Sequence, residues 1–91
     1  MSLTLEIVTP TGVALAETEL DSVVVRRRED RFDPGSEIVI LKSHGPLLVS
    51  SAACVVRFRA GGRIGAVRVG RGVAEVLRDR VTVLAREAEV L

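Results

Sequence analysis

The chain has 91 residues, 47% of them hydrophobic, with two phenylalanines as its only aromatic residues and a formal net charge of +1. This length provides one domain, residues 1–91, with an aliphatic core. The near-neutral charge and the scarcity of aromatic rings argue against nucleic-acid binding, which depends on phosphate neutralisation and base stacking. Cys54 is the only cysteine, which excludes an internal disulfide or a cysteine-based zinc cluster.

No apolar run approaches the roughly eighteen residues of a membrane helix, and no signal-peptide pattern opens the chain. We therefore expect a soluble protein in a reducing compartment.

The first part of the chain predicts three short strands. Residues Leu3–Ile7 alternate apolar and polar side chains, and Pro10 and Gly12 then predict a turn. A second run covers Val13–Glu17, and a third, rich in β-branched valine, covers Leu20–Val25.

A charged loop then separates this part from the next strand. The loop covers Arg26–Gly35 and ends in the turn sequence Asp33-Pro34-Gly35. Its three consecutive arginines are offset by nearby acidic residues, so the sequence predicts a solvated loop rather than a basic patch. Strand character resumes at Glu37–Leu41 and is interrupted at Gly45-Pro46.

The second half predicts four strands joined by tight turns. They are 54–59, Arg63–Val69, Val73–Arg78 and Arg80–Arg86. Gly61-Gly62 closes a hairpin between the first two, and Asp79 joins the last two. The only helical character is at Ala85–Glu89. The whole pattern of eight to ten short strands predicts an all-β, antiparallel sandwich or flattened barrel.

The chain contains few residues that match known catalytic or metal-binding patterns. His44 is the only histidine, and no carboxylate lies at a conventional metal-pairing interval from it. Cys54 alternates with Val56 and Phe58, so we expect a packed thiol rather than a nucleophile. Gly70-Arg71-Gly72 lacks the lysine and following helix of a phosphate-binding loop, so it predicts a tight turn. We therefore expect no catalytic residue, metal site or cofactor site, and no enzyme.

Three segments, taken in order, resemble the epsilon subunit of F-type ATP synthases, specifically its N-terminal β-sandwich domain. Leu5-Glu6-Ile7-Val8-Thr9-Pro10 is similar to the family's opening strand. Residues 36–48, which end in Ser43-His44-Gly45-Pro46-Leu47-Leu48, are similar to its Gly-Glu-Leu/Phe-Gly-Ile-Leu-Pro-Gly-His-Ala-Pro-Leu-Leu segment. Gly70 to Val76 with Val81 to Ala85 is similar to the third segment, so the resemblance spans nearly the whole chain.

The departures from the family pattern are local. Lys42-Ser43 replaces Pro-Gly, Val39 replaces a glycine, and the Arg26–Gly35 loop is several residues longer. An Arg-Gly-Val segment at Arg71 and an Arg-Glu-Ala ending at Arg86 resemble the alternate, sodium-type branch of these ATPases.

The resemblance implies a non-catalytic rotor subunit. In this family the domain clamps the foot of the gamma subunit and rests on the polar loops of the membrane c-ring, coupling ion flow to the shaft. Glu37 and His44 match positions at the c-ring interface, and Thr9 matches one near the gamma contact. The residues alone leave open a solvent-facing role for Glu37 and an ordinary turn role for His44. Such a subunit lies at the cytoplasmic face of the bacterial membrane and reaches it only through the complex.

Family members usually continue into a two-helix C-terminal domain that can bind ATP. Residues Glu87–Leu91 supply barely one helical turn, so we expect the helical hairpin to be absent. We therefore expect no ATP binding and no helix-mediated inhibition by this chain, and ATP binding at micromolar affinity would refute this. The alternative function is a stand-alone β-sandwich module that binds a protein or a glycan, although two phenylalanines hardly supply a groove for it.

Overall fold

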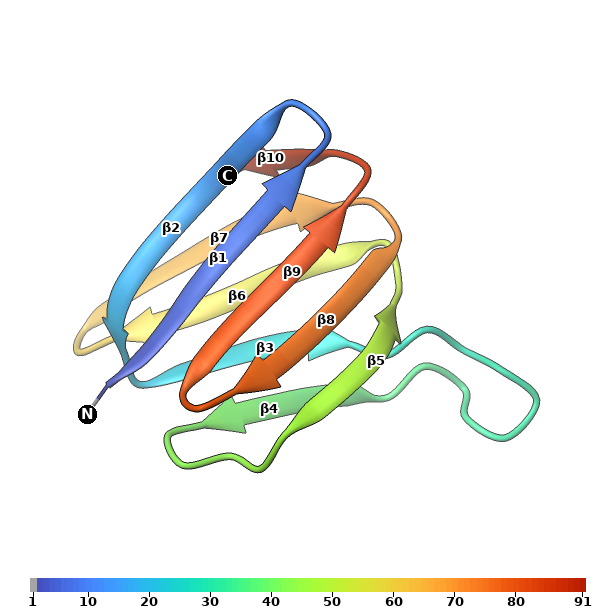
Figure 1. Ribbon diagram of the computed structural model, residues 1–91, viewed down its shortest axis with the longest axis horizontal. Coiled ribbons are helices and arrows are strands. Elements are labelled where there is room, and N and C mark those ends of the chain that lie inside the picture. The colour runs from blue at the N-terminus through green and yellow to red at the C-terminus, as the bar shows by residue number, and fades with distance from the viewer. Residues whose placement is uncertain (1) are drawn as a thin grey trace.

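The computed structural model describes residues 2–91 as two stacked five-stranded sheets (Figure 1). The strands are β1 (Leu3–Thr9), β2 (Gly12–Leu20), β3 (Ser22–Arg26), β4 (Glu37–Leu41), β5 (Leu47–Ser51), β6 (Cys54–Ala60), β7 (Arg63–Val69), β8 (Gly72–Leu77), β9 (Arg80–Ala85) and β10 (Ala88–Val90). Sheet A has the order β2-β1-β9-β8-β5, and sheet B has the order β10-β7-β6-β3-β4. The all-β sandwich prediction is confirmed. Residues 2–91 include no helix long and apolar enough to cross a membrane.

Alternating side chains of both sheets build an aliphatic core between them. The strands contribute mainly valine, leucine and isoleucine to it, and Phe58, 6% exposed, is its one aromatic residue among those described. Burying each such side chain stabilises the fold by about 1.5–3 kcal/mol. Cys54 is half-buried at the start of β6 and packs against this core, which confirms the prediction of a packed thiol.

A parallel pair lies at the centre of sheet A. β1 pairs with β9 in parallel register, with Leu5 opposite Val81 and Ile7 opposite Val83, while β2 flanks β1 on its other side. The other strand pairs of both sheets are antiparallel. The first strand therefore cannot complete its sheet by local hairpin formation, because its second partner comes more than seventy residues later.

The predicted strand Leu20–Val25 is wrong at its start. β2 ends at Leu20 and β3 begins at Ser22, so the chain turns at Asp21. The Asp21 carboxylate Oδ2 accepts a hydrogen bond from the Gly61 backbone N–H at 2.7 Å. The acidic residue thus fixes the β2–β3 turn against the β6–β7 turn, a contact that no local pattern reveals.

The predicted helical character of Ala85–Glu89 is also wrong. β9 ends at Ala85, and Ala88–Val90 forms β10, which pairs with the end of β7. The Gly70 N–H donates to the Glu87 carbonyl oxygen at 3.0 Å and closes the connection. A free sheet edge offers this segment a full hydrogen-bond ladder, whereas a helix of five residues is not stable alone.

Close packing against the backbone leaves no room for a side chain at Gly72. Gly72 lies opposite Ala85, and a Cβ on Gly72 would overlap the backbone carbonyl oxygen of Leu84. We expect Gly72→Ala to lower the free energy of unfolding by about 1–3 kcal/mol, because a backbone atom cannot move aside as a flexible side chain can. Urea denaturation measures the change.

Gly62→Ala is the matched control. An added Cβ at Gly62 meets nothing within 4 Å, so this variant should stay within about 0.5 kcal/mol of the parent. Equal unfolding midpoints for the two variants would contradict the assigned packing.

Candidate functional site

The three predicted contact residues lie at different places on the sandwich. Glu37 begins β4, and the turn containing His44 follows its last residue, Leu41. At about 3.3 Å per residue, β4 separates Glu37 from Leu41 by roughly 13 Å. Thr9 ends β1 in the other sheet, at the end opposite the His44 turn, since Thr4 at the start of β1 lies beside the β8–β9 turn. The structure therefore does not gather the three residues into one site.

Glu37 belongs to an ion-pair cluster on the outer face of sheet B. Its Oε2 accepts a hydrogen bond from Arg57 Nη2 at 2.8 Å and lies 3.8 Å from Arg26 Nη2. All three side chains are about half exposed, so these pairs contribute little to stability. The carboxylate is held in place and remains accessible from solvent.

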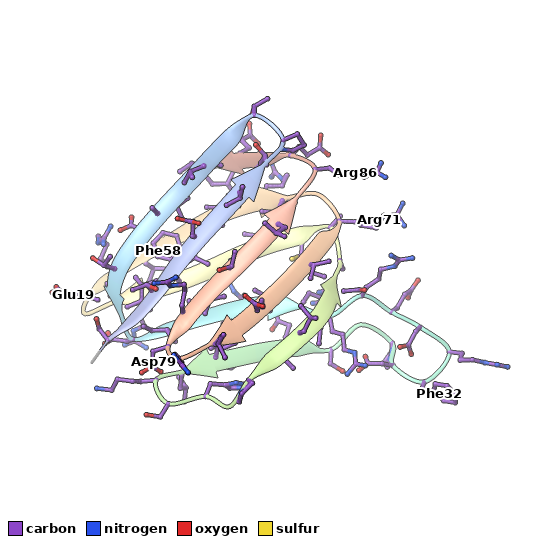
Figure 2. All side chains as sticks on the ribbon, in the orientation of Figure 1. Glu19, Phe32, Phe58, Arg71, Asp79 and Arg86 are labelled. Carbon is purple, nitrogen blue, oxygen red and sulfur yellow. The ribbon has the colours of Figure 1, made fainter. Side chains whose placement is uncertain are left out.

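His44 lies in a turn that is fastened to the opposite sheet. Its backbone N–H donates to the Leu41 carbonyl oxygen at 3.2 Å, and its ring Nδ1 lies 2.8 Å from the Gly45 carbonyl oxygen. Ser43, just before it, donates its backbone N–H to Asp79 Oδ1 at 2.6 Å. This bond joins the β4–β5 turn to the β8–β9 turn, where Figure 2 labels Asp79. We call these two joined turns the turn clasp.

The turn clasp includes Lys42-Ser43, which stands where the resemblance expects Pro-Gly. Ser43 takes the glycine's place and adopts a left-handed backbone with φ of 66°. Few residues other than glycine adopt this conformation without strain. The hydrogen bond to Asp79 holds Ser43 there.

Thr9 stabilises its own turn and also lines a cavity. Its Oγ1 donates to the Gly12 carbonyl oxygen at 3.3 Å and lies 3.0 Å from Thr11 Oγ1. A cavity of about 370 Å³ beside it is lined by Val8, Thr9, Pro10, Arg71, Gly72, Leu84, Ala85 and Arg86. Figure 2 shows Arg71 and Arg86 at this end of the molecule.

An apolar row crosses the outer face of sheet A next to that cavity. Strand register places Val13, Val8, Leu84 and Val73 side by side across β2, β1, β9 and β8. Val13 is 59% exposed, Leu84 51% and Val73 37%. We call these four residues the outer strip. An exposed, contiguous apolar surface of this kind is typical of a protein-binding site.

Sequence reasoning missed the outer strip. Its members occupy the strand positions that alternate with buried residues, where a half-buried sheet usually places polar side chains. The sequence signal for it is apolar residues at consecutive strand positions, such as Val83-Leu84, which place apolar side chains on both faces of the strand. That signal is ambiguous, because a strand buried on both faces has the same composition.

The long β3–β4 loop, residues 27–36, projects from the sandwich as an ordered hairpin (Figure 1). Asp30 Oδ1 accepts backbone hydrogen bonds from Phe32 and Asp33, and Asp33 Oδ1 accepts from Gly35 and Ser36. The predicted Asp33-Pro34-Gly35 turn is thus confirmed. Backbone N–H groups of Ser36 and Gly35, the Ser36 hydroxyl and the Arg27 charge together lower the pKa of Asp33.

Comparison with known proteins supplies the family. A model of the family described as ATP synthase, Delta/Epsilon chain, beta-sandwich domain matches residues 2–90. The ATP synthase epsilon chain of Nitratidesulfovibrio vulgaris is 40% identical over 88 residues, which cover 97% of this chain and 60% of that protein. The epsilon chain of Desulfitobacterium hafniense is 36% identical over 90 residues, covering 97% and 61%. The chain thus spans about three fifths of the length of these relatives.

Solved structures share the fold. A chain in the Euglena gracilis mitochondrial ATP synthase structure (OSCP/F1/c-ring) superposes with a TM-score of 0.82 at 18% identity, covering 98% of this chain and 53% of that one. A chain in the Tetrahymena thermophila mitochondrial ATP synthase central stalk/c-ring structure gives 0.74 at 12% identity, covering 98% and 66%.

Replacing Ser43 by glycine should stabilise the protein. Glycine adopts the left-handed backbone without the steric cost that Ser43 bears, and the bond to Asp79 uses only the backbone N–H. We expect Ser43→Gly to raise the free energy of unfolding by about 1 kcal/mol, measured by urea denaturation. Ser50→Gly within β5 is the matched control and should instead lower it by about 0.5–1 kcal/mol. A loss of stability in Ser43→Gly would contradict the assigned backbone strain.

The loop should respond to acid through Asp33. Because the folded pKa lies below the unfolded value, its stabilising contribution is complete only above about pH 5 and is lost as the pH falls through the folded pKa. NMR titration should give a midpoint for the Asp33 carboxyl below about 3.9, with the Gly35 and Ser36 amide signals shifting in parallel. In Asp33→Asn, that common transition should disappear. Its persistence would assign the shift to another group.

Proposed function

The chain belongs to the ATP synthase delta/epsilon chain β-sandwich family, and on that premise we propose that it acts as a non-catalytic central-stalk subunit of an F-type ATP synthase. In this role it binds the gamma subunit and the c-ring, and it couples ion flow through the ring to rotation of the gamma shaft. It supplies no catalytic residue of its own. It lies at the cytoplasmic face of a bacterial membrane and is held there by the complex.

The outer strip is the observation that carries this proposal. Four apolar residues from four adjacent strands form a contiguous row in which Val13, Leu84 and Val73 are exposed, and such a surface is suited to a permanent protein partner. We assign it to gamma, because Thr9, the residue predicted near the gamma contact, lines the cavity that also includes Val8 and Leu84.

The outer strip also favours this role over the alternative of a stand-alone glycan-binding module. Carbohydrate surfaces usually rely on stacking aromatic rings, and the outer strip contains none. Its aliphatic side chains suit packing against another protein.

The two predicted c-ring contacts, Glu37 and His44, are too far apart for a single turn of this chain to provide both. Glu37 and His44 lie at opposite ends of β4, so a ring surface that touches both must extend at least roughly 13 Å along this strand. The ion pairs of Glu37 and the turn clasp around His44 would present both side chains in fixed positions. The assignment to the sodium-type branch remains a prediction that rests on the Arg71-Gly72-Val73 and Arg86-Glu87-Ala88 residues.

A charge placed in the outer strip should weaken gamma binding. We expect Leu84→Asp to reduce the affinity for the gamma subunit of the same organism at least about tenfold, because a carboxylate would lose its hydration in an apolar interface. Calorimetric titration with purified gamma measures this.

Val39→Asp, on the outer face of sheet B, is the matched control. Val39 is 55% exposed, close to the 51% of Leu84, and its substitution should leave gamma affinity unchanged. Equal losses in both variants would refute the assignment to sheet A. Absence of binding between the parent chain and gamma at micromolar concentrations would refute the rotor role itself.

A further inference from the structure

Four arginines converge on a cleft at the base of the β3–β4 loop, and we propose that this cleft binds a multiply charged phosphate anion such as inorganic pyrophosphate. The cleft has a volume of about 410 Å³, and its charged lining residues are Arg26, Arg27, Arg28, Glu29 and Arg71. This proposal concerns a surface other than the outer strip and does not depend on the rotor role.

The fold brings the fourth arginine to the other three. Arg71 lies in the β7–β8 turn, and the next residue, Gly72, pairs with Ser51 at the end of β5. Ser51 in turn forms a β-bridge with Arg27. The end of β5 therefore holds the turn and the loop base together. Figure 2 shows Arg71 at the end of the sandwich from which the loop projects.

The loop geometry places only one of the loop's acidic residues in the lining of the cleft. The prediction that nearby acids offset the arginines holds in part, because Asp33 Oδ2 lies 3.8 Å from Arg27 Nε, but neither Asp30 nor Asp33 lines the cleft. Oδ1 of each aspartate accepts two backbone hydrogen bonds of the loop. Glu29 is the one acidic residue in the lining, while Glu37 and Asp33 offset Arg26 and Arg27 from beside it. Four arginines and three carboxylates leave the cleft with one net positive charge, and its two arginines that are unpaired within residues 2–91 are available to an anion.

Two of the four guanidinium groups are positioned and two are free to bind. Arg26 Nη1 donates to the Gly35 carbonyl oxygen at 2.6 Å and its Nη2 lies 3.8 Å from Glu37 Oε2, while Arg27 Nε lies 3.8 Å from Asp33 Oδ2. Within residues 2–91, neither Arg28 nor Arg71 forms an ion pair. A planar guanidinium matches the geometry of phosphate oxygens and can donate two parallel hydrogen bonds to them.

The lining also limits the class of ligand. It includes no aromatic ring on which a nucleobase could stack. A nucleotide would therefore be bound through its phosphates alone, and adenosine would contribute nothing. The proposal departs from the expectation of no ATP binding only in that the cleft would hold the phosphates of ATP.

The experiment is a titration of the 15N-labelled 91-residue chain at low ionic strength with phosphate, pyrophosphate, ATP or adenosine, followed by NMR. Pyrophosphate should shift the amide signals of residues 26–29 and Arg71 in a saturable way below about 5 mM, and more tightly than phosphate, because charge governs the affinity. ATP should bind no more tightly than pyrophosphate, and adenosine should have no effect. No saturable shift with pyrophosphate would overturn the site, and ATP binding tenfold tighter than pyrophosphate would overturn the ligand class.

Variants test which arginines hold the anion. Arg71→Ala and Arg28→Ala should each weaken pyrophosphate binding about fivefold, and Arg71→Lys should retain more affinity than Arg71→Ala because it keeps the charge. Arg63→Ala, an exposed arginine at the start of β7 and at the far end of the sandwich, is the matched control. If Arg63→Ala weakened pyrophosphate binding equally, the effect would come from the net charge of the protein, and binding in the cleft would be refuted. Thermal unfolding of each variant checks that the fold is kept.

Discussion

The pairing of β1 with β9 is the constraint on which the rest of the sandwich depends. β1 is the first strand of the chain, yet it lies inside sheet A between β2 and β9. Its inner side chains, Leu5 and Ile7, are almost fully buried opposite Val81 and Val83. The same register places Val8 beside Leu84 and so creates the outer strip. The inner face that stabilises the fold and the outer face proposed to bind a partner are therefore set by one strand alignment.

The sequence predicted the local features of the fold and missed the nonlocal ones. Alternation in Leu3–Ile7 and the Gly61-Gly62 hairpin are short-range signals, and both are confirmed. Parallel pairing between residues more than seventy positions apart leaves no local pattern, since either partner could form an antiparallel edge. The turn at Asp21 was not predicted for a similar reason, because the Gly61 amide that fixes it lies 40 residues away. The Ala85–Glu89 error arose because helical propensity cannot register an open sheet edge.

The candidate functional residues also differ in whether a local sequence pattern could predict them. Thr9, Glu37 and His44 came from a family resemblance, which gives positions but not their spacing in this chain, and the structure places them at separate points. The outer strip could not be predicted because strand alternation does not tell which apolar face is covered. The charged cleft was missed for a different reason. Counting acids along the loop assumes that all of them offset the arginines, whereas within residues 2–91 Asp33 pairs with Arg27 and Asp30 only accepts backbone amides of the loop.

The two ends of the molecule are mechanically connected through one hairpin. Val73 near the start of β8 and Leu84 near the end of β9 belong to the outer strip, and the tight turn at Arg78 and Asp79 joins these strands at the other end. Asp79 also accepts the Ser43 amide, so the hairpin continues through the turn clasp to His44. A partner docked on the outer strip and a second partner at the turn clasp would therefore be linked by two hydrogen-bonded strands. A joint that transmits torque needs such a connection, because a flexible loop between the two surfaces would absorb the rotation.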